Sequence, residues 1–247
     1  METRSEHSPR ERAEAAYDHL AGRVESRVQG ALDRLPPHVK PKLRGWLHLG
    51  AIPLALVACL ALLVVADDTA TRAAVAVYTA TSLLLFSVSA VYHRGSWSPG
   101  MAGFLRRLDH ADIFLIIAGT YTPFAVVLLS PERGRLLLAL VWSGAFAGVV
   151  FRLLWLGAPR WTYVAAYVAL GWTALFFVGD IARAGGGLVL GLLVLGGLLY
   201  TVGAVVYATQ KPDPSPRWFG YHEVFHACTI GAWLAMYASI AVAVTHG

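Results

Sequence analysis

The sequence YHEVFH, residues Tyr221–His226, opens the last apolar segment of the chain, Phe219–Thr245. His222 and His226 are four residues apart, so in a helix they lie on one face, one turn apart. Histidine nitrogens are common zinc ligands, and a His or Glu inside a membrane span is costly and usually functional. The stretch predicts either two of the ligands of a metal site or two histidines that are solvated at the membrane surface. A third ligand at the same depth would favour the metal site.

The composition predicts an integral membrane protein. Of 247 residues, 57% are hydrophobic and only 14% are charged, whereas soluble domains average about 45–50% and about 25%. The net charge of +5 comes from Lys and Arg that flank apolar segments. It therefore indicates topology and contact with anionic lipid headgroups rather than a nucleic-acid partner. Cys59 and Cys228 lie in separate apolar segments and form no CxxC pair or disulfide framework.

Seven apolar segments are candidates for membrane-spanning helices, for which about 20 residues suffice. They are Trp46–Ala66, Ala73–Tyr92, Ala111–Leu129, Leu136–Phe151, Trp161–Val178, Gly187–Tyr207 and Phe219–Thr245. Brief loops separate them, which favours antiparallel neighbours. The expected fold is an all-α bundle of seven transmembrane helices formed by residues 46–247.

Residues 1–45 are expected to form a cytosolic tail outside this bundle. Apolar residues recur at intervals of three and four from Ala13 to Leu35, which is the pattern of an amphipathic helix, and Pro36-Pro37 would end it. Such a helix could lie on the membrane surface or pack against loops. A frayed tail is the alternative.

The distribution of basic residues predicts the orientation. With the N-terminus and the even-numbered loops on one side, that side carries ten Lys and Arg near the spans, and the other side carries four. The positive-inside rule then places the N-terminus in the cytosol and the C-terminus outside. This arrangement is opposite to that of G-protein-coupled receptors. The chain is accordingly expected to be a multi-pass protein of the cell membrane.

This topology brings polar residues from three spans to one depth. Ser89 and His93 fall at the cytosolic end of the second span, Asp109 directly precedes the third, and His222 and His226 begin the seventh. Three His ligands with one open position are typical of catalytic zinc sites. Asp109 could accept a proton from water, and Ser89 could orient that water or a ligand. The alternative for His93 is an interfacial residue at a helix end.

Other polar residues allow further interpretations. HEVFH matches the HExxH signature of zinc metalloproteases, with Glu223 as general base and His93 as a formal third ligand. However, Glu223 points about 100° away from His222 on a helix. Asp112 shares a helix face with Asp109, so either carboxylate could enter the site. His48, at the start of the first span, is expected to be interfacial.

Four motifs in this order resemble the hemolysin III family, which belongs with the progestin and adipoQ receptors. They are SAVYH (Ser89–His93), RLDHA (Arg107–Ala111), IAGTYTP (Ile117–Pro123) and HEVFH (His222–His226). The resemblance covers the chain from about residue 45 onward. It implies a seven-span fold with a cytosolic N-terminus and, for the bacterial branch, a part in membrane lipid homeostasis.

The resemblance also implies roles for individual residues. The family's zinc ligands match His93, His222 and His226, and its Ser and Asp positions match Ser89 and Asp109. The receptor branch often has an acidic residue one turn before the Ser, where this chain has Leu85 and Phe86. Related seven-span proteins include alkaline ceramidases, and the wider group is regarded as metal-dependent lipid amide hydrolases.

The leading hypothesis from the sequence is a zinc-dependent hydrolase that acts on an amide or ester bond of a membrane lipid. The second hypothesis is a membrane sensor or a pore-forming cytolysin in which zinc is structural. An intramembrane metalloprotease is the least favoured alternative.

Overall fold

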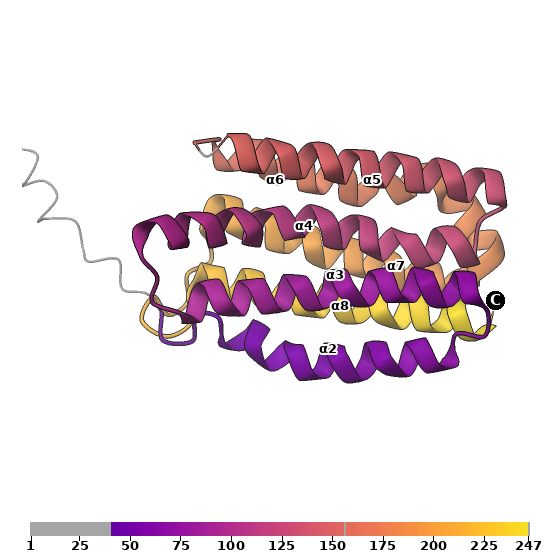
Figure 1. The fold of residues 1–247 in the computed structure, drawn as a ribbon, viewed down its shortest axis with the longest axis horizontal. Coiled ribbons are helices and arrows are strands. Elements are labelled where there is room, and N and C mark those ends of the chain that lie inside the picture. Colours follow the sequence, from indigo (N-terminus) through magenta and orange to yellow (C-terminus); the bar gives the residue numbers. More distant parts are fainter. Residues whose placement is uncertain (1–40, 156, 247) are drawn as a thin grey trace, which may run out of the picture. The chain divides into compact units, whose positions relative to one another are not determined.

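A computed structural model describes residues 41–155 and 157–246, and this part of the chain is helical (Figure 1). The predicted amphipathic helix at residues 13–35 lies outside the described residues. The helices are α2 (Trp46–Val65), α3 (Thr69–Arg94), α4 (Pro99–Val127), α5 (Pro131–Leu154), α6 (Arg160–Gly171), the 3₁₀ helix η1 (Trp172–Phe177), α7 (Val178–Thr209) and α8 (Tyr221–His246). Extended pairing in this part is limited to one isolated bridge between Ser215 and Phe219. The predicted all-α class is confirmed.

Six helices of the described part are long and apolar enough to cross a membrane. One of these six is the 50-residue stretch Arg160–Thr209, which would be about 75 Å long as a straight helix, against a hydrocarbon core of about 30 Å. It is not straight, because Gly186 has φ 71° and ψ −177°, far from helical values. Glycine tolerates this positive φ without steric strain. The chain runs in one direction through α6 and returns along α7 (Figure 1).

Local sequence determines where several helices begin. Ser98 and Ser130 each precede a proline at the first helical position, and each side chain accepts a backbone N–H of the first turn, as expected for an N-cap followed by proline. The Ser98 cap starts α4 at Pro99, twelve residues before the predicted span. Asp109 therefore lies inside a helix rather than just before one.

Helix α8 is tied to three other helices by hydrogen bonds in the bundle interior. The indole Nε1 of Trp233 donates to Ser82 Oγ of α3 at 2.9 Å, and the Tyr237 hydroxyl donates to the carbonyl of Ala58 in α2 at 2.9 Å. Ser239 Oγ donates to the carbonyl of Val189 in α7 at 2.8 Å. Helices with such partners cannot rotate freely, so the side chains at the start of α8 have fixed directions.

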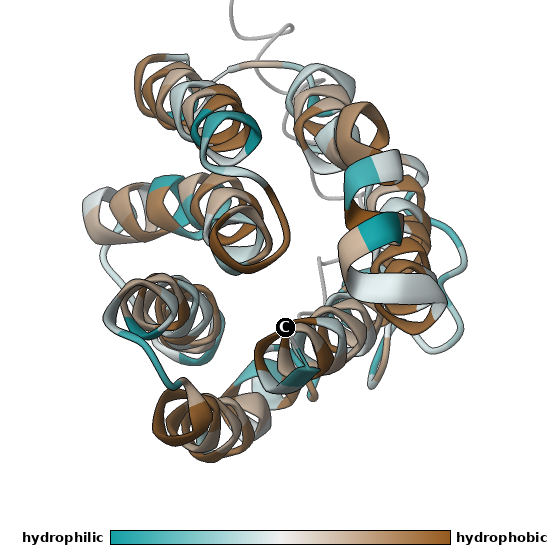
Figure 2. Cartoon of the chain, turned by 90° about the vertical axis from the view of Figure 1, so that its right-hand side faces the viewer, coloured by the Kyte–Doolittle hydropathy of each residue, from teal (hydrophilic) through white to brown (hydrophobic). Residues whose placement is uncertain are grey.

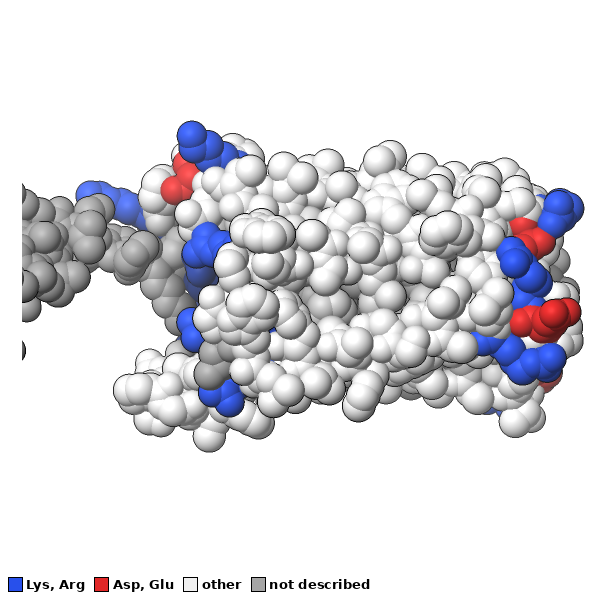
Figure 3. All heavy atoms as spheres, turned by 90° about the horizontal axis from the view of Figure 1, so that it is seen from above, with Lys and Arg blue, Asp and Glu red and all other residues white. Residues whose placement is uncertain are grey.

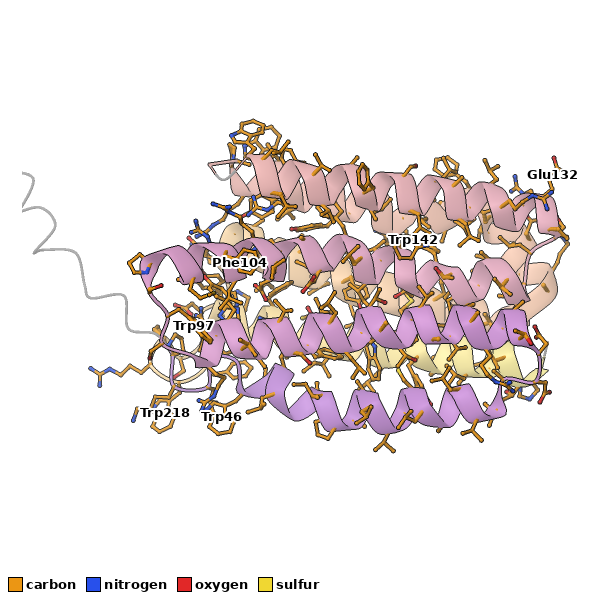
Figure 4. The ribbon with its side chains drawn as sticks, viewed as in Figure 1. Trp46, Trp97, Phe104, Glu132, Trp142 and Trp218 are labelled. Atoms are coloured by element: carbon orange, nitrogen blue, oxygen red, sulfur yellow. The ribbon has the colours of Figure 1, made fainter. Side chains whose placement is uncertain are left out.

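The surface of the bundle matches a membrane environment. Lys, Arg, Asp and Glu gather at the two ends, and the long middle band is free of them in the face shown (Figure 3). The end-on view shows mostly hydrophobic residues along the helices (Figure 2). Trp46, Trp97 and Trp218 lie together at one end, far from Glu132 at the other (Figure 4). Interfacial tryptophans of this kind are typical of membrane proteins.

Candidate metal site

Three histidines from two helices meet at the end of the bundle that carries Trp46 and Trp218. His93 lies in the last turn of α3, and His222 and His226 lie in the first two turns of α8. One ring nitrogen from each of the three lies within 4.8 Å of the others. The Nε2 atoms of His93 and His222 face each other at 3.1 Å. All three side chains are buried, so the structure brings together the three predicted ligands.

The chemistry of this donor set fits a zinc ion. Nitrogen ligands of a tetrahedral Zn²⁺ lie about 2.0–2.1 Å from the metal, and hence about 3.3 Å from each other. The separation of the His93 and His222 nitrogens is close to that value. The Nδ1 atom of His226 is buried and has no hydrogen-bond partner within the described part of the chain. At least one ring nitrogen of the three imidazoles is therefore not used in a hydrogen bond within the described structure and is available to bind a metal.

Ser89 and Asp109 border the same site from α3 and α4. Asp109 Oδ2 lies 3.7 Å from His93 Nε2 and 3.9 Å from His110 Nδ1. Ser89 lies one turn before His93, and its buried hydroxyl has no partner among the residues described. The two candidate carboxylates differ in position, because Asp109 borders the cavity described below and Asp112 does not.

An apolar cavity of about 130 Å³ adjoins the histidines. Its lining on α8 runs from His222 to Met236, a distance of about 21 Å along a helix. Ser89, Asp109, His222 and His226 border one part of it, and most of the remaining lining is apolar, including Ile113, Ile117, Phe124, Leu193 and Val194. The cavity therefore extends from the histidines along α8 and has mostly apolar walls.

Glu223 has a structural role that its place in HEVFH did not reveal. It is fully buried, and its Oε2 accepts the backbone N–H of Gly220 at 2.8 Å, as in a capping box. Its Oε1 accepts from Arg44 Nε, an ion pair that joins the segment before α2 to the start of α8. Backbone N–H groups of the same segment donate to the carbonyls of Arg217 and Trp218. Both carboxylate oxygens are thus engaged, which disfavours Glu223 as the general base of a protease.

His48 is the residue that sequence reasoning placed wrongly. The sequence predicts an interfacial side chain, but the structure buries it, with its ring stacked on that of His226 at 3.8 Å and 9°. The turn just before α2 also lies close to the site, because Gly45 has a φ of 80° and a Cβ there would lie 2.8 Å from His93 Cβ. In the predicted topology, His48 lies at the cytosolic start of the first span, at the same depth as His93 and His222. This shared depth is the sequence signal that could have placed His48 at the site.

Comparison with known proteins identifies the family. The family described as "Haemolysin-III related" matches residues 38–237, which include every residue of the site. Hemolysin-3 of Bacillus cereus is 30% identical over 192 residues, covering 76% of this chain and 84% of the relative. The Hemolysin-3 homolog of Bacillus subtilis strain 168 is 32% identical over 164 residues, covering 65% and 72%. The described helices and these matches together show that the chain belongs to the haemolysin-III related family.

Proposed function

We propose that this protein is a zinc-dependent hydrolase that cleaves an amide or ester bond of a membrane lipid. The observation that carries the proposal is the meeting of three buried histidines with a long apolar cavity. The histidines supply the ligand set, and the cavity supplies a place for an acyl chain. Neither feature alone would indicate a lipid substrate.

Each residue of the site has a chemical task in this proposal. His93, His222 and His226 would hold the ion, which as a Lewis acid polarises the carbonyl to be attacked. The carboxylate of Asp109 accepts a proton from the attacking water. The hydroxyl of Ser89 has no hydrogen-bond partner among the described residues, so it can donate to the attacking water or to the lipid and orient it. Hydrolysis adds one water to the lipid and releases a fatty acid together with an amine or an alcohol.

The proposal includes the seven-span topology with a cytosolic N-terminus in the bacterial plasma membrane. The break at Gly186 supports it by dividing the stretch Arg160–Thr209 into two lengths that could each cross. The basic residues favour the cytosol for the end that carries the histidines. The acyl chain would then lie within the membrane, with its carbonyl near the cytosolic surface. This location suits an enzyme of membrane lipid homeostasis.

A second candidate function is cytolysis with structural zinc. The names of the two Bacillus relatives favour it, since one is called hemolysin-3 and the other a hemolysin-3 homolog. In this reading the ion only joins α3 to α8, and Asp109 has no chemical task. Lysis of erythrocytes by purified protein, without any product released from their lipids, would support this candidate.

The decisive experiment compares the wild type with Asp109→Asn in liposomes made from bacterial lipid extract. Loss of the proton acceptor should reduce fatty-acid release by about 100-fold or more, while zinc content stays at about one ion per chain. Asp112→Asn is the matched control, because it removes a carboxylate of the same helix that does not border the cavity. If the wild type and Asp109→Asn release the same amount of fatty acid, Asp109 is not the proton acceptor. If the wild type releases no fatty acid, the proposed hydrolysis is refuted.

A further inference from the structure

His48 is held in one orientation by rings from two other helices. Its imidazole stacks on that of His226 in α8, with 3.8 Å between ring centroids and 9° between planes. The ring of Phe86 in α3 contacts it edge-on, at 5.2 Å and 70°. The side chain is 2% exposed. A histidine packed in this way presents its nitrogens in fixed directions.

Neither ring nitrogen of His48 has a hydrogen-bond partner among the described residues. A neutral imidazole carries one donor and one acceptor, and burying both without partners is unfavourable. Trp233 and Tyr237, by contrast, donate to partners on other helices. His48 lines the apolar cavity, so a molecule that enters the cavity can reach its unpaired nitrogens.

The geometry excludes His48 as a fourth ligand in its present orientation. An imidazole binds zinc in the plane of its ring at about 2.0–2.1 Å. Two parallel rings 3.8 Å apart cannot both direct an in-plane nitrogen at one ion over that distance. His48 is also absent from the group of nitrogens within 4.8 Å. It therefore lies beside the ligand set, on the side of the cavity.

We propose that His48 contacts the substrate, donating a ring N–H to the carbonyl oxygen of the acyl group that lies in the cavity. This inference rests on the proposed function, because that function puts a carbonyl next to the histidines. It also makes His48 a determinant of specificity. The site would bind a chain that carries a carbonyl group more tightly than a plain hydrocarbon, because the hydrocarbon has no oxygen to accept the His48 hydrogen bond.

The test uses a ligand that cannot be hydrolysed, 2-tridecanone with ¹³C at its carbonyl, added to zinc-loaded protein in nanodiscs. A hydrogen bond moves the carbonyl resonance downfield. His48→Phe keeps an aromatic ring against His226 and removes both nitrogens. We expect this variant to retain zinc, to lose most of the downfield shift and to bind the ketone about tenfold more weakly. His48→Gln, which keeps a side-chain N–H, should retain part of the shift.

Tridecane is the matched ligand control, and His48→Phe should bind it as the wild type does. If His48→Phe fails to fold, His48→Met removes the nitrogens with a flexible side chain and is measured in the same way. An unchanged ketone shift and affinity in the variant would overturn the proposal, as would loss of zinc from it.

A wild type that shows the His48-dependent shift but hydrolyses no lipid would contradict only the proposed function. Hydrolysis with no His48-dependent shift would contradict only this inference.

Discussion

The two ends of the bundle differ in whether their polar side chains have hydrogen-bond or ion-pair partners. At the end with the histidines, His48, Ser89 and His226 have buried polar atoms without partners in the described structure. At the opposite end, Asp180 accepts from Arg133 at 2.9 Å and also pairs with Arg183. There Asp68 caps α3 by accepting two backbone N–H groups.

The difference separates structural polar groups from those available for a ligand. The Arg133–Asp180 pair joins the starts of α5 and α7, is partly exposed and needs no further partner. The histidine end has buried polar atoms that no described residue satisfies, so they are available to an ion, water or substrate. Substitutions at the two ends should therefore affect different properties.

The largest expected effect is loss of the metal. The triple variant His93→Ala, His222→Ala, His226→Ala removes all three candidate ligands, so zinc measured by mass spectrometry of purified protein should fall from about one ion per chain to background. Arg133→Gln, at the other end, is the control and should keep its zinc. Zinc retained by the triple variant would refute the metal site.

Next in size is the effect of Glu223→Gln on stability. The substitution removes the negative charge that pairs with Arg44 and replaces one accepting oxygen with an NH₂ group. Glu223 is buried and Arg44 is 18% exposed, so the loss should be about 2–3 kcal/mol. Denaturant unfolding in detergent should show this loss, while zinc content and lipid hydrolysis per folded molecule stay unchanged. A large fall in turnover without a loss of stability would instead support Glu223 as a general base.

A smaller effect is expected from Gly45→Ala. The φ of 80° is costly for alanine, by about 1–2 kcal/mol, and the new Cβ would press on His93 Cβ. We expect a lower melting temperature and faster removal of zinc by a chelator. Gly50→Ala is the matched control, because a Cβ there meets nothing within 4 Å. Equal chelation rates in the two variants would show that the turn does not support the site.

The smallest effect should come from Arg133→Gln at the structural end. It removes an ion pair that water already screens, so the melting temperature should change less than in Glu223→Gln. Zinc content and hydrolysis should match the wild type. A loss of zinc in this variant would mean that the two ends are coupled, and the comparison between them would fail.

Much of the fold could be predicted because it follows from short-range patterns. Apolar segments of about 20 residues indicate membrane helices regardless of their partners. The four-residue spacing places His222 and His226 on one face of any helix that contains them. Charge counting then grouped His93 and Asp109 with them by depth. The roles of these residues stay predictions until metal and product are measured.

The sequence by itself determined the helical membrane class, the family and the set of residues that meet at one end. Only the tertiary structure decided that His48 stacks on His226, that Glu223 binds Arg44, and that Asp109 rather than Asp112 borders the cavity. The physical reason is that hydrophobic periodicity defines neighbours within a helix. Contacts between helices depend on their rotation and close approach, which the packing of the whole bundle sets.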